Sequence, residues 1–314
     1  MANADRHEIS NWIKSRTIEI GFSECAIAEA GFLTDEEARL DRWLELGYHG
    51  EMGYMARNRE KRLDPRNLLP GARSVIIVLM NYFPSGTLPE NDNYKIAKYA
   101  YGMDYHFVIR EKLKKLVNDI NSRYGQMNAR VFTDSAPVLE RAWAEKTGLG
   151  WIGKNTCLIH PKNGSFFFIG EIITDMELEY DDRKINDLCG GCTRCIEACP
   201  TGAIIAPRLL DARKCISYLT IEFNGELPGE QQDAFNDWIF GCDICQDVCP
   251  WNRKAEHHQV TEFHPQPLLK TMNKARWEAL TRDEFQVLFS NSAVKRTGFE
   301  GLTRNIFFVK KKEI

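Results

Sequence analysis

Eight of the ten cysteines lie between residues 189 and 249, and their spacing is typical of iron–sulfur chemistry. The first run reads Cys-x2-Cys-x2-Cys-x3-Cys-Pro, the bacterial signature in which the fourth thiolate ligates the other of two clusters. A second run, Cys-x2-Cys-x3-Cys-Pro, lacks one thiolate. We therefore expect two [4Fe–4S] clusters with crossed ligation, one held by Cys189, Cys192, Cys195 and Cys249, and the other by Cys199, Cys215, Cys242 and Cys245.

Zinc and disulfides are the alternative uses of such cysteines. Zinc ribbons use two Cys-x2-Cys pairs and do not need the longer first run. Disulfides require an oxidising compartment, and the start of the chain has no apolar stretch typical of an export signal. The pattern favours clusters, which carry electrons, so the remaining sequence must indicate what those electrons reduce.

Composition places the chain among ordinary globular proteins. Its 314 residues are 43% hydrophobic and 27% charged, and this length corresponds to about two domains. No apolar run approaches the roughly 20 residues of a membrane span, so we expect a cytoplasmic protein without membrane contact, and a monomer. The net charge of −3 excludes a globally basic nucleic-acid binder but leaves room for a local basic face.

Hydrophobic periodicity predicts strands and helices in alternation before the cysteines. The run from Val75 to Met80 is short, apolar and β-branched, as in a strand covered on both faces. Thr34 and Glu37 are spaced as a capping box. The expected strands are 75–80, 95–100, 130–132 and 165–174, and the expected helices lie within 8–50 and over 105–123 and 137–146.

These elements predict three regions. Residues 1–180 form an α/β (α+β) domain that carries the catalytic site, and residues 181–255 form the two-cluster ferredoxin domain. Residues 256–314 form a short helical segment. From Leu268 onwards it contains ten Lys and Arg against five Asp and Glu. Such a face is either a solvated helical cap or a surface that contacts phosphates.

The block from Val131 to Ile159, followed by the two cysteine runs, resembles the epoxyqueuosine reductase family. The resemblance covers nearly the whole chain and implies a cobalamin-binding domain followed by two [4Fe–4S] clusters. It also implies an oxidoreductase that reduces the epoxide of epoxyqueuosine at the wobble position of the tRNA anticodon. Residues 293–305 are similar to the start of the HEAT-like helical region of longer members.

Asp134 is the residue that we expect to donate the proton to the epoxide. It follows a predicted strand, where an α/β domain presents ligand-facing groups. A carboxylic acid can protonate a leaving oxygen, but at neutral pH it needs a raised pKa. A helix-capping role is the alternative that the sequence alone leaves open. Arg141, seven residues on, is spaced about two helical turns away and is expected either to orient the substrate or to make a surface ion pair.

The resemblance also implies a set of cofactor contacts, and the basic end of the chain adds expected tRNA contacts. The expected cobalamin contacts are Arg57, Ala97, Asp134, Asn155, Thr156, Cys157, Gly170 and Ser217. The expected tRNA contacts are Arg141, Lys310, Lys311 and Lys312. For Cys157, a small buried hydrophobe is the alternative interpretation.

Asp104-Tyr105-His106 departs from a known cobalamin pattern. Many base-off cobalamin proteins bind cobalt through the histidine of Asp-x-His-x-x-Gly, but here Ile109 replaces the glycine. We therefore do not assign His106 as a cobalt ligand. The sequence has no Gly-x-Gly-x-x-Gly loop, so we expect electrons from an external flavodoxin or ferredoxin rather than from a nicotinamide.

Two other functions remain open at this point. A reductive dehalogenase has a comparable corrin and ferredoxin arrangement but usually carries an export signal. A plain electron carrier would need only the cysteine region, which leaves about 180 residues of α/β sequence without a purpose. Binding of a corrin would separate the carrier from the two enzymes.

Overall fold

A four-stranded antiparallel sheet organises the first half of the computed structural model, which describes residues 5–89 and 91–310. Val75 to Met80 lie on its second strand and are almost wholly buried, so the prediction of a strand covered on both faces is confirmed. In spatial order the strands are β1 (Glu24–Glu29), β2 (Ser74–Asn81), β7 (Phe167–Thr174) and β4 (Ala129–Phe132).

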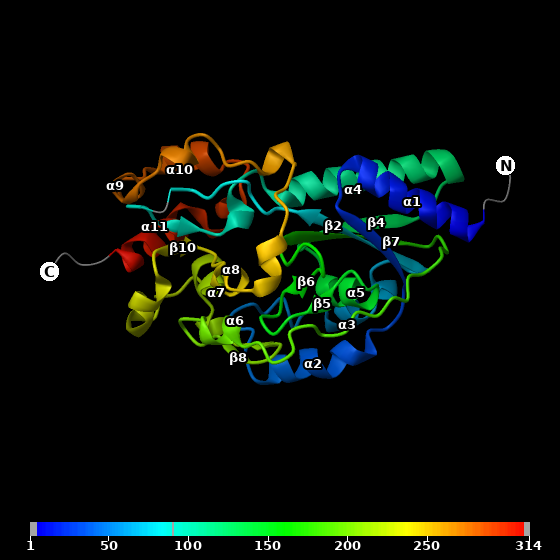
Figure 1. The fold of residues 1–314 in the computed structure, drawn as a ribbon, viewed down its shortest axis with the longest axis horizontal. Coiled ribbons are helices and arrows are strands. Elements are labelled where there is room, and N and C mark those ends of the chain that lie inside the picture. Colours follow the sequence, from blue (N-terminus) through cyan, green and yellow to red (C-terminus); the bar gives the residue numbers. More distant parts are fainter. Residues whose placement is uncertain (1–4, 90, 311–314) are drawn as a thin grey trace.

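Helices cover both faces of this sheet (Figure 1). Helices α1 (Arg6–Ile20) and α4 (Tyr105–Tyr124) lie on one face, and α5 (Glu140–Lys146) lies on the other. Because side chains alternate along a strand, Ile76 and Val78 pack in the cluster that includes α1 and α4. Their neighbours Val75 and Ile77 pack instead with Trp143 of α5.

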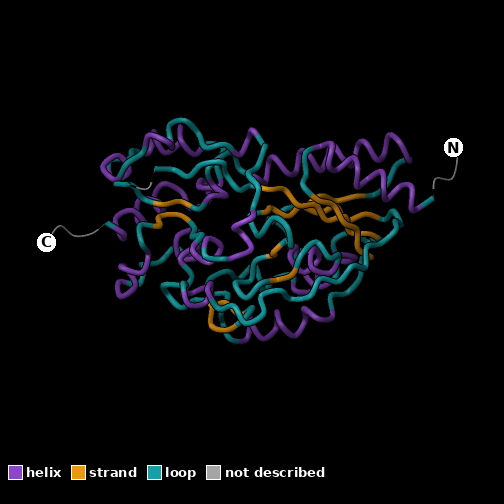
Figure 2. The backbone as a smooth tube through the Cα atoms, viewed as in Figure 1, coloured by secondary structure: helices purple, strands orange, loops and turns teal. Residues whose placement is uncertain are grey.

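The remaining elements are short and are joined by long loops (Figure 2). The strands are β3 (Lys95–Ile96), β5 (Trp151–Ile152), β6 (Leu158–Ile159), β8 (Ile204–Ala206), β9 (Leu209–Leu210) and β10 (Trp238–Phe240). The helices are α2 (Thr34–Glu45), α3 (Arg59–Leu63), α6 (Arg194–Glu197), α7 (Ile216–Ile221), α8 (Ile244–Asp247), α9 (Lys274–Glu278), α10 (Arg282–Phe289) and α11 (Gly298–Val309).

The three expected regions share one hydrophobic core. Strand β3 of the first region pairs in parallel with β10 of the second. One apolar cluster contains Ile13 of α1, Phe240 of β10 and Ile306 of α11. The C-terminal helices therefore pack on the cysteine region, at the opposite end of the molecule from α1 (Figure 1). None of the helices in the described ranges combines the length and apolar character needed to cross a bilayer.

Some local predictions are wrong. The range 8–50 contains strand β1 as well as helices, and α2 begins at Thr34 after Leu33, with no side chain bonding its N-terminus. Only Lys95 and Ile96 of the predicted strand 95–100 are extended, because Lys98 begins a 3-10 turn. Helix α5 begins at Glu140 rather than at Pro137. In each case a long-range contact or loop conformation overrides the local pattern.

Asn305 joins the C-terminal helix to the cysteine region and provides a test of this packing. It is fully buried and donates from Nδ2 to the carbonyls of Thr220 at 2.8 Å and Ile239 at 2.9 Å. Replacing Asn305 with Ala leaves both buried carbonyls without these donors. Because the Thr220 carbonyl keeps the Thr297 hydroxyl as a donor at 3.1 Å, we expect the free energy of unfolding in urea to fall by about 1–3 kcal/mol, the cost of one unsatisfied group.

Asn224→Ala is the matched control, because the Asn224 side chain is exposed and makes only a long local bond to Glu222. Its free energy of unfolding should change by no more than about 0.5 kcal/mol. Equal losses in the two variants would contradict a shared core.

Candidate active site and iron–sulfur sites

The cluster cysteines fall into two groups in space. The Cys195 thiol interacts electrostatically with those of Cys189, Cys192 and Cys249. None of the ten cysteines, all within the described ranges, forms a disulfide. No three His, Cys, Asp or Glu side chains in the described ranges converge as a site for a single metal ion.

The second group also assembles from distant segments. The Cys242 thiol interacts with those of Cys215 and Cys199, and Cys245 interacts with Cys215 and Cys242. Cys199 of the first run therefore lies with the second group of thiols, and Cys249 of the second run lies with the first group. This grouping agrees with the crossed ligation expected from the spacing, which stays a prediction about bound clusters.

Several N–H groups point at these sulfur atoms. The Trp151 indole donates to Cys189 Sγ at 3.4 Å, and the Ala203 backbone donates to Cys199 Sγ at 3.3 Å. Backbone N–H groups of Ser217 and Tyr218 bond Cys215 at the start of α7. Such donors stabilise thiolates and are one of the means by which a protein tunes a cluster.

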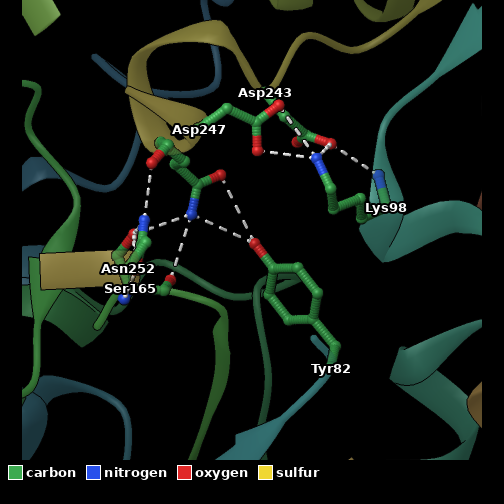
Figure 3. A network of polar contacts seen from close by, with 7 residues as sticks. Tyr82, Lys98, Ser165, Asp243, Asp247 and Asn252 are labelled. Atoms are coloured by element: carbon green, nitrogen blue, oxygen red, sulfur yellow. Dashed lines mark hydrogen bonds and ion pairs between the residues drawn. The ribbon is translucent and has the colours of Figure 1, made fainter. Parts of the chain in front are cut away.

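A polar network fastens the second cysteine run to the sheet domain (Figure 3). Gln246 donates to the Ser165 hydroxyl at 3.0 Å and to the Tyr82 hydroxyl at 3.3 Å. Asn252 also donates to the Ser165 hydroxyl, at 3.0 Å. These groups are buried and bonded to one another, so they fix the relative position of the two parts.

Lys98 makes a second attachment beside this network (Figure 3). Its ammonium lies 2.7 Å from Asp247, and its backbone N–H donates to Asp243 at 2.8 Å. Both acids belong to the segment that carries Cys242 and Cys245, Asp243 as the N-cap of α8 and Asp247 as its last residue. The segment around Ala97 therefore contacts the cysteine region directly, and Ala97 itself is buried and donates its N–H to Phe240.

The loop containing residues 155–157 lies against the same cysteine run. Asn155 donates from Nδ2 to the Cys245 carbonyl at 3.3 Å, and the Cys157 thiol contacts that of Cys245. Thr156, between them, adopts a left-handed φ of 67°. Arg141 on α5 donates to the Thr156 carbonyl at 2.5 Å. This loop therefore connects the second cluster site to helix α5.

Asp134 lies on the other side of this connection, in the loop between β4 and α5. Its carboxylate accepts a hydrogen bond from the Tyr105 hydroxyl at 2.5 Å, and His106 Nε2 lies 3.6 Å away. Its backbone N–H donates to Glu140, and its φ of 53° is left-handed. The side chain is nevertheless 60% exposed, so the carboxylate is accessible to a ligand.

The proton in this group resides on histidine rather than on Asp134. Desolvation acts to raise the pKa of Asp134, but the contacts with His106 and Tyr105 outweigh it and hold that pKa below its usual value. Desolvation acts to lower the pKa of His106, yet Asp104 and Asp134 raise it to about 9. Asp134 therefore lacks, in this arrangement, the raised pKa that an acid needs at neutral pH.

Two glutamates lie behind Asp134. Burial and then the charge of Asp134 raise the pKa of Glu140 to about 8. Glu171 of β7 is 0% exposed, and no donor among the described residues reaches either of its carboxylate oxygens. Burial and then the nearby Glu140 raise the pKa of Glu171 well above its usual value. Burial and the nearby Glu140 therefore disfavour a negative charge on Glu171.

The other predicted cofactor residues are scattered around this centre. Arg57 is exposed. Ser217 is half-buried at the start of α7, next to Cys215. Gly170 has a packing role, because a Cβ there would lie 2.8 Å from Ile109 of α4. Their contacts with a corrin stay predictions.

Arg141 does not occupy the position that its spacing predicts. Because α5 begins only at Glu140, no helix joins Asp134 to Arg141, and the two-turn spacing does not apply. Arg141 instead bonds Thr156 and leaves its exposed guanidinium at the edge of the site.

Most described cations of the basic C-terminal segment form ion pairs or hydrogen bonds within the molecule. Arg304 donates to the carbonyls of Leu219, Phe223 and Gly225. These cations are less available to phosphates than composition indicates, and Lys311 and Lys312 lie outside the described residues. The segment's ion pairs are Arg282–Glu300, Arg296–Glu222, Lys274–Asp237 and Lys310–Glu278.

Sequence reasoning missed four members of the site. Tyr105 and His106 reach Asp134 from the start of α4, and Glu140 and Glu171 reach it from α5 and β7. For Glu171 the sequence does contain an indication. It is the one acid within the apolar run Phe166–Ile173, and a buried acid there is unusual enough to suggest a functional role.

Comparisons with known proteins agree with this arrangement. A family model described as 4Fe-4S double cluster binding domain matches residues 188–252. A second model, described as Epoxyqueuosine reductase QueG, DUF1730, matches residues 62–135. An epoxyqueuosine reductase of Cyclobacterium marinum is 49% identical over 313 residues, which cover 99% of each chain.

Solved structures match at the level of the fold and the sequence. One is an epoxyqueuosine reductase with an epoxyqueuosine-modified tRNA-Tyr stem loop, with a TM-score of 0.90 and 30% identity over 97% of this chain and 81% of that one. Another is the Bacillus subtilis enzyme with its Asp134 catalytic loop swung out of the active site. It has a TM-score of 0.87 and 30% identity, over 97% of this chain and 82% of that one.

A catabolic reductive dehalogenase shares the fold alone, with a TM-score of 0.50 and 17% identity over 80% of this chain and 33% of that one. The relatives with 30% identity or more match nearly the whole chain and include both the sheet domain and the cysteine region. The chain belongs to the epoxyqueuosine reductase family of oxidoreductases.

Proposed function

We propose that this chain reduces the epoxide of epoxyqueuosine in the anticodon loop of tRNA, at the wobble position, and so forms queuosine. The proposal is supported by family membership and by the relative solved with an epoxyqueuosine-modified stem loop. The reaction takes place where tRNA is found, so the protein works in the cytoplasm, as a monomer.

One observation carries the proposal, namely a continuous path of contacts from the second cysteine site to Asp134. The loop of residues 155–157 contacts Cys245 and bonds Arg141. Glu140, next to Arg141 on α5, bonds the Asp134 backbone. Electrons from a cluster at Cys245 and a proton from Asp134 would thus reach one substrate site beside the 155–157 loop.

The residues along this path fit a cobalamin. The exposed Asp134 carboxylate and the 155–157 loop would hold it, together with Arg57, the backbone near Ala97 and Ser217. When bound, cobalamin supplies a reduced cobalt that attacks carbon, which iron–sulfur clusters do not do at a distance. Gly170 packs closely against Ile109 of α4, and its contact with the corrin stays a prediction.

Removal of an epoxide oxygen as water consumes two electrons and two protons. The two clusters relay electrons singly from an external flavodoxin or ferredoxin. Asp134 delivers protons to the oxygen, because its carboxylate is the exposed acid of the site. Arg141, exposed beside it, orients the tRNA base, and Lys310, Lys311 and Lys312 contact tRNA phosphates.

Asp134→Ala tests the role of the carboxylate. We expect kcat for tRNA that contains epoxyqueuosine to fall by at least about 10²-fold, the usual minimum contribution of a positioned acid. Cluster absorption should be unchanged. The measurement is anaerobic turnover with a chemical reductant, with visible spectra of each preparation.

Asp119→Ala is the control, since Asp119 pairs with Arg16 and lies on α4, away from the site. Its turnover should match that of the wild type. A fully active Asp134→Ala enzyme would refute the assigned acid.

The lysine cluster at the end of the chain predicts a salt effect. Replacing Lys310, Lys311 and Lys312 by Ala should reduce the slope of log affinity for tRNA against log salt. The slope should change by about 0.7–0.9 for each phosphate that the variant no longer neutralises. Since Lys310 already pairs with Glu278, most of the change should come from the other two lysines.

Lys184→Ala provides an exposed control on the linker before the cysteines. Filter-binding titrations over a range of salt give each slope. An identical slope in the triple variant and the wild type would exclude this segment from the tRNA surface.

A further inference from the structure

Asp104 and His106 begin helix α4 beside Asp134, and the proposed function gives them no role. Asp104 is the N-cap of the helix and accepts from the His106 backbone at 3.0 Å. Its Oδ1 also lies 2.7 Å from His106 Nδ1. A carboxylate can only accept, so Nδ1 carries a proton, and Nε2 is left directed at Asp134, 3.6 Å away.

The imidazole is held rigidly in this direction. It stacks on the Tyr105 ring with centroids 4.1 Å apart, and Tyr105 stacks on Phe168 at the same separation. The Tyr105 hydroxyl bonds the same Asp134 oxygen that His106 approaches. His106 is 21% exposed, so its ring can still exchange protons with water.

The proposed reaction requires such a group. Any two-electron reduction of an epoxide consumes two protons, and a single carboxyl carries one. In addition, Asp134 rests as a carboxylate, since its contacts with His106 and Tyr105 hold its pKa below the usual value despite desolvation. Asp134 must therefore receive each proton from a neighbour before it can donate.

We propose that His106, oriented by Asp104, is the proton carrier that loads Asp134 for each of the two proton transfers. The Nε2 proton passes to the Asp134 carboxylate and from there to the substrate oxygen. The neutral imidazole then regains a proton from water. The oxygen leaves as water after two protons and two electrons, which the clusters supply under the proposed function on which this inference rests.

Other charged groups around the pair do not serve as well. Glu140 bonds the Asp134 backbone N–H rather than its carboxylate, and Glu171 lies behind Glu140 in the sheet. Arg296 acts on Asp134 only through its charge and is paired with Glu222. Among the described residues, only Tyr105 and His106 place a donor group at the Asp134 carboxylate.

His106→Gln tests the carrier in the reconstituted enzyme. We expect kcat to fall by at least about 10²-fold, with KM for the tRNA changed by less than about threefold, because removing a proton carrier slows chemistry and leaves binding intact. His257→Gln is the control, because His257 stacks on Phe83 and bonds the Pro84 carbonyl, away from Asp134.

The wild-type rate should also decline as pH rises through about 9, since His106 there loses the proton that it must deliver. Asp104→Asn keeps a hydrogen-bond acceptor for the ring but removes the charge, so this decline should move to lower pH. Activity of His106→Gln within about threefold of wild type would overturn the proposal, since a positioned proton carrier contributes far more.

Carbon-13 NMR of the histidine rings in the full chain gives a readout that does not depend on turnover. The His106 resonance should titrate near pH 9 in the wild type and lower in both Asp104→Asn and Asp134→Asn. A His106 that titrates near its ordinary pKa, unmoved by either change, would refute the pairing. A correct titration with no turnover of epoxyqueuosine tRNA by the wild type would instead count against the proposed function.

Discussion

The contact between the 155–157 loop and the second cysteine run is the interaction on which the chemistry depends. Electron transfer falls off with distance, so a redox cofactor must lie close to both a cluster and the acid that protonates its substrate. Asn155 and Cys157 meet Cys245 at this point. The buried network of Gln246, Ser165 and Asn252 fixes the cysteine run on the sheet, and the shared core leaves the two parts little freedom to separate.

Under the proposed function, the electrostatics of the site explain how an ionised aspartate would serve as a proton donor. A carboxylate with a histidine and a tyrosine donor at one oxygen is stabilised in its charged form. In that arrangement Asp134 is ionised at rest, so it can accept a proton and pass it on but does not hold one. The proton at rest is held by the His106 imidazole, whose other ring nitrogen, Nδ1, faces Asp104. Burial and the charge of Glu140 raise the pKa of Glu171, which disfavours an additional negative charge behind Asp134.

Local spacing predicted the elements whose contacts are close in sequence. The cysteine runs and the apolar strand from Val75 to Met80 are of this kind, as is helix α4. The edge strand β1 was missed because Cys25 and its alanine neighbours are weakly β-forming and depend on pairing with β2. The β3–β10 pair joins Lys95 to Trp238, and no periodicity reports a contact of that sequence separation. The sequence pattern only raised and then excluded His106 as a cobalt ligand, because its approach to Asp134 arises from loop geometry.

The most direct test is turnover of tRNA that contains epoxyqueuosine by the cluster-reconstituted protein, measured with and without cobalamin. The proposed function predicts stoichiometric corrin binding, followed by visible spectroscopy, and conversion to queuosine only when cobalamin is present. Conversion at the same rate without cobalamin would contradict the assigned cofactor. Clusters that form without any corrin binding or turnover would leave a protein that only transfers electrons.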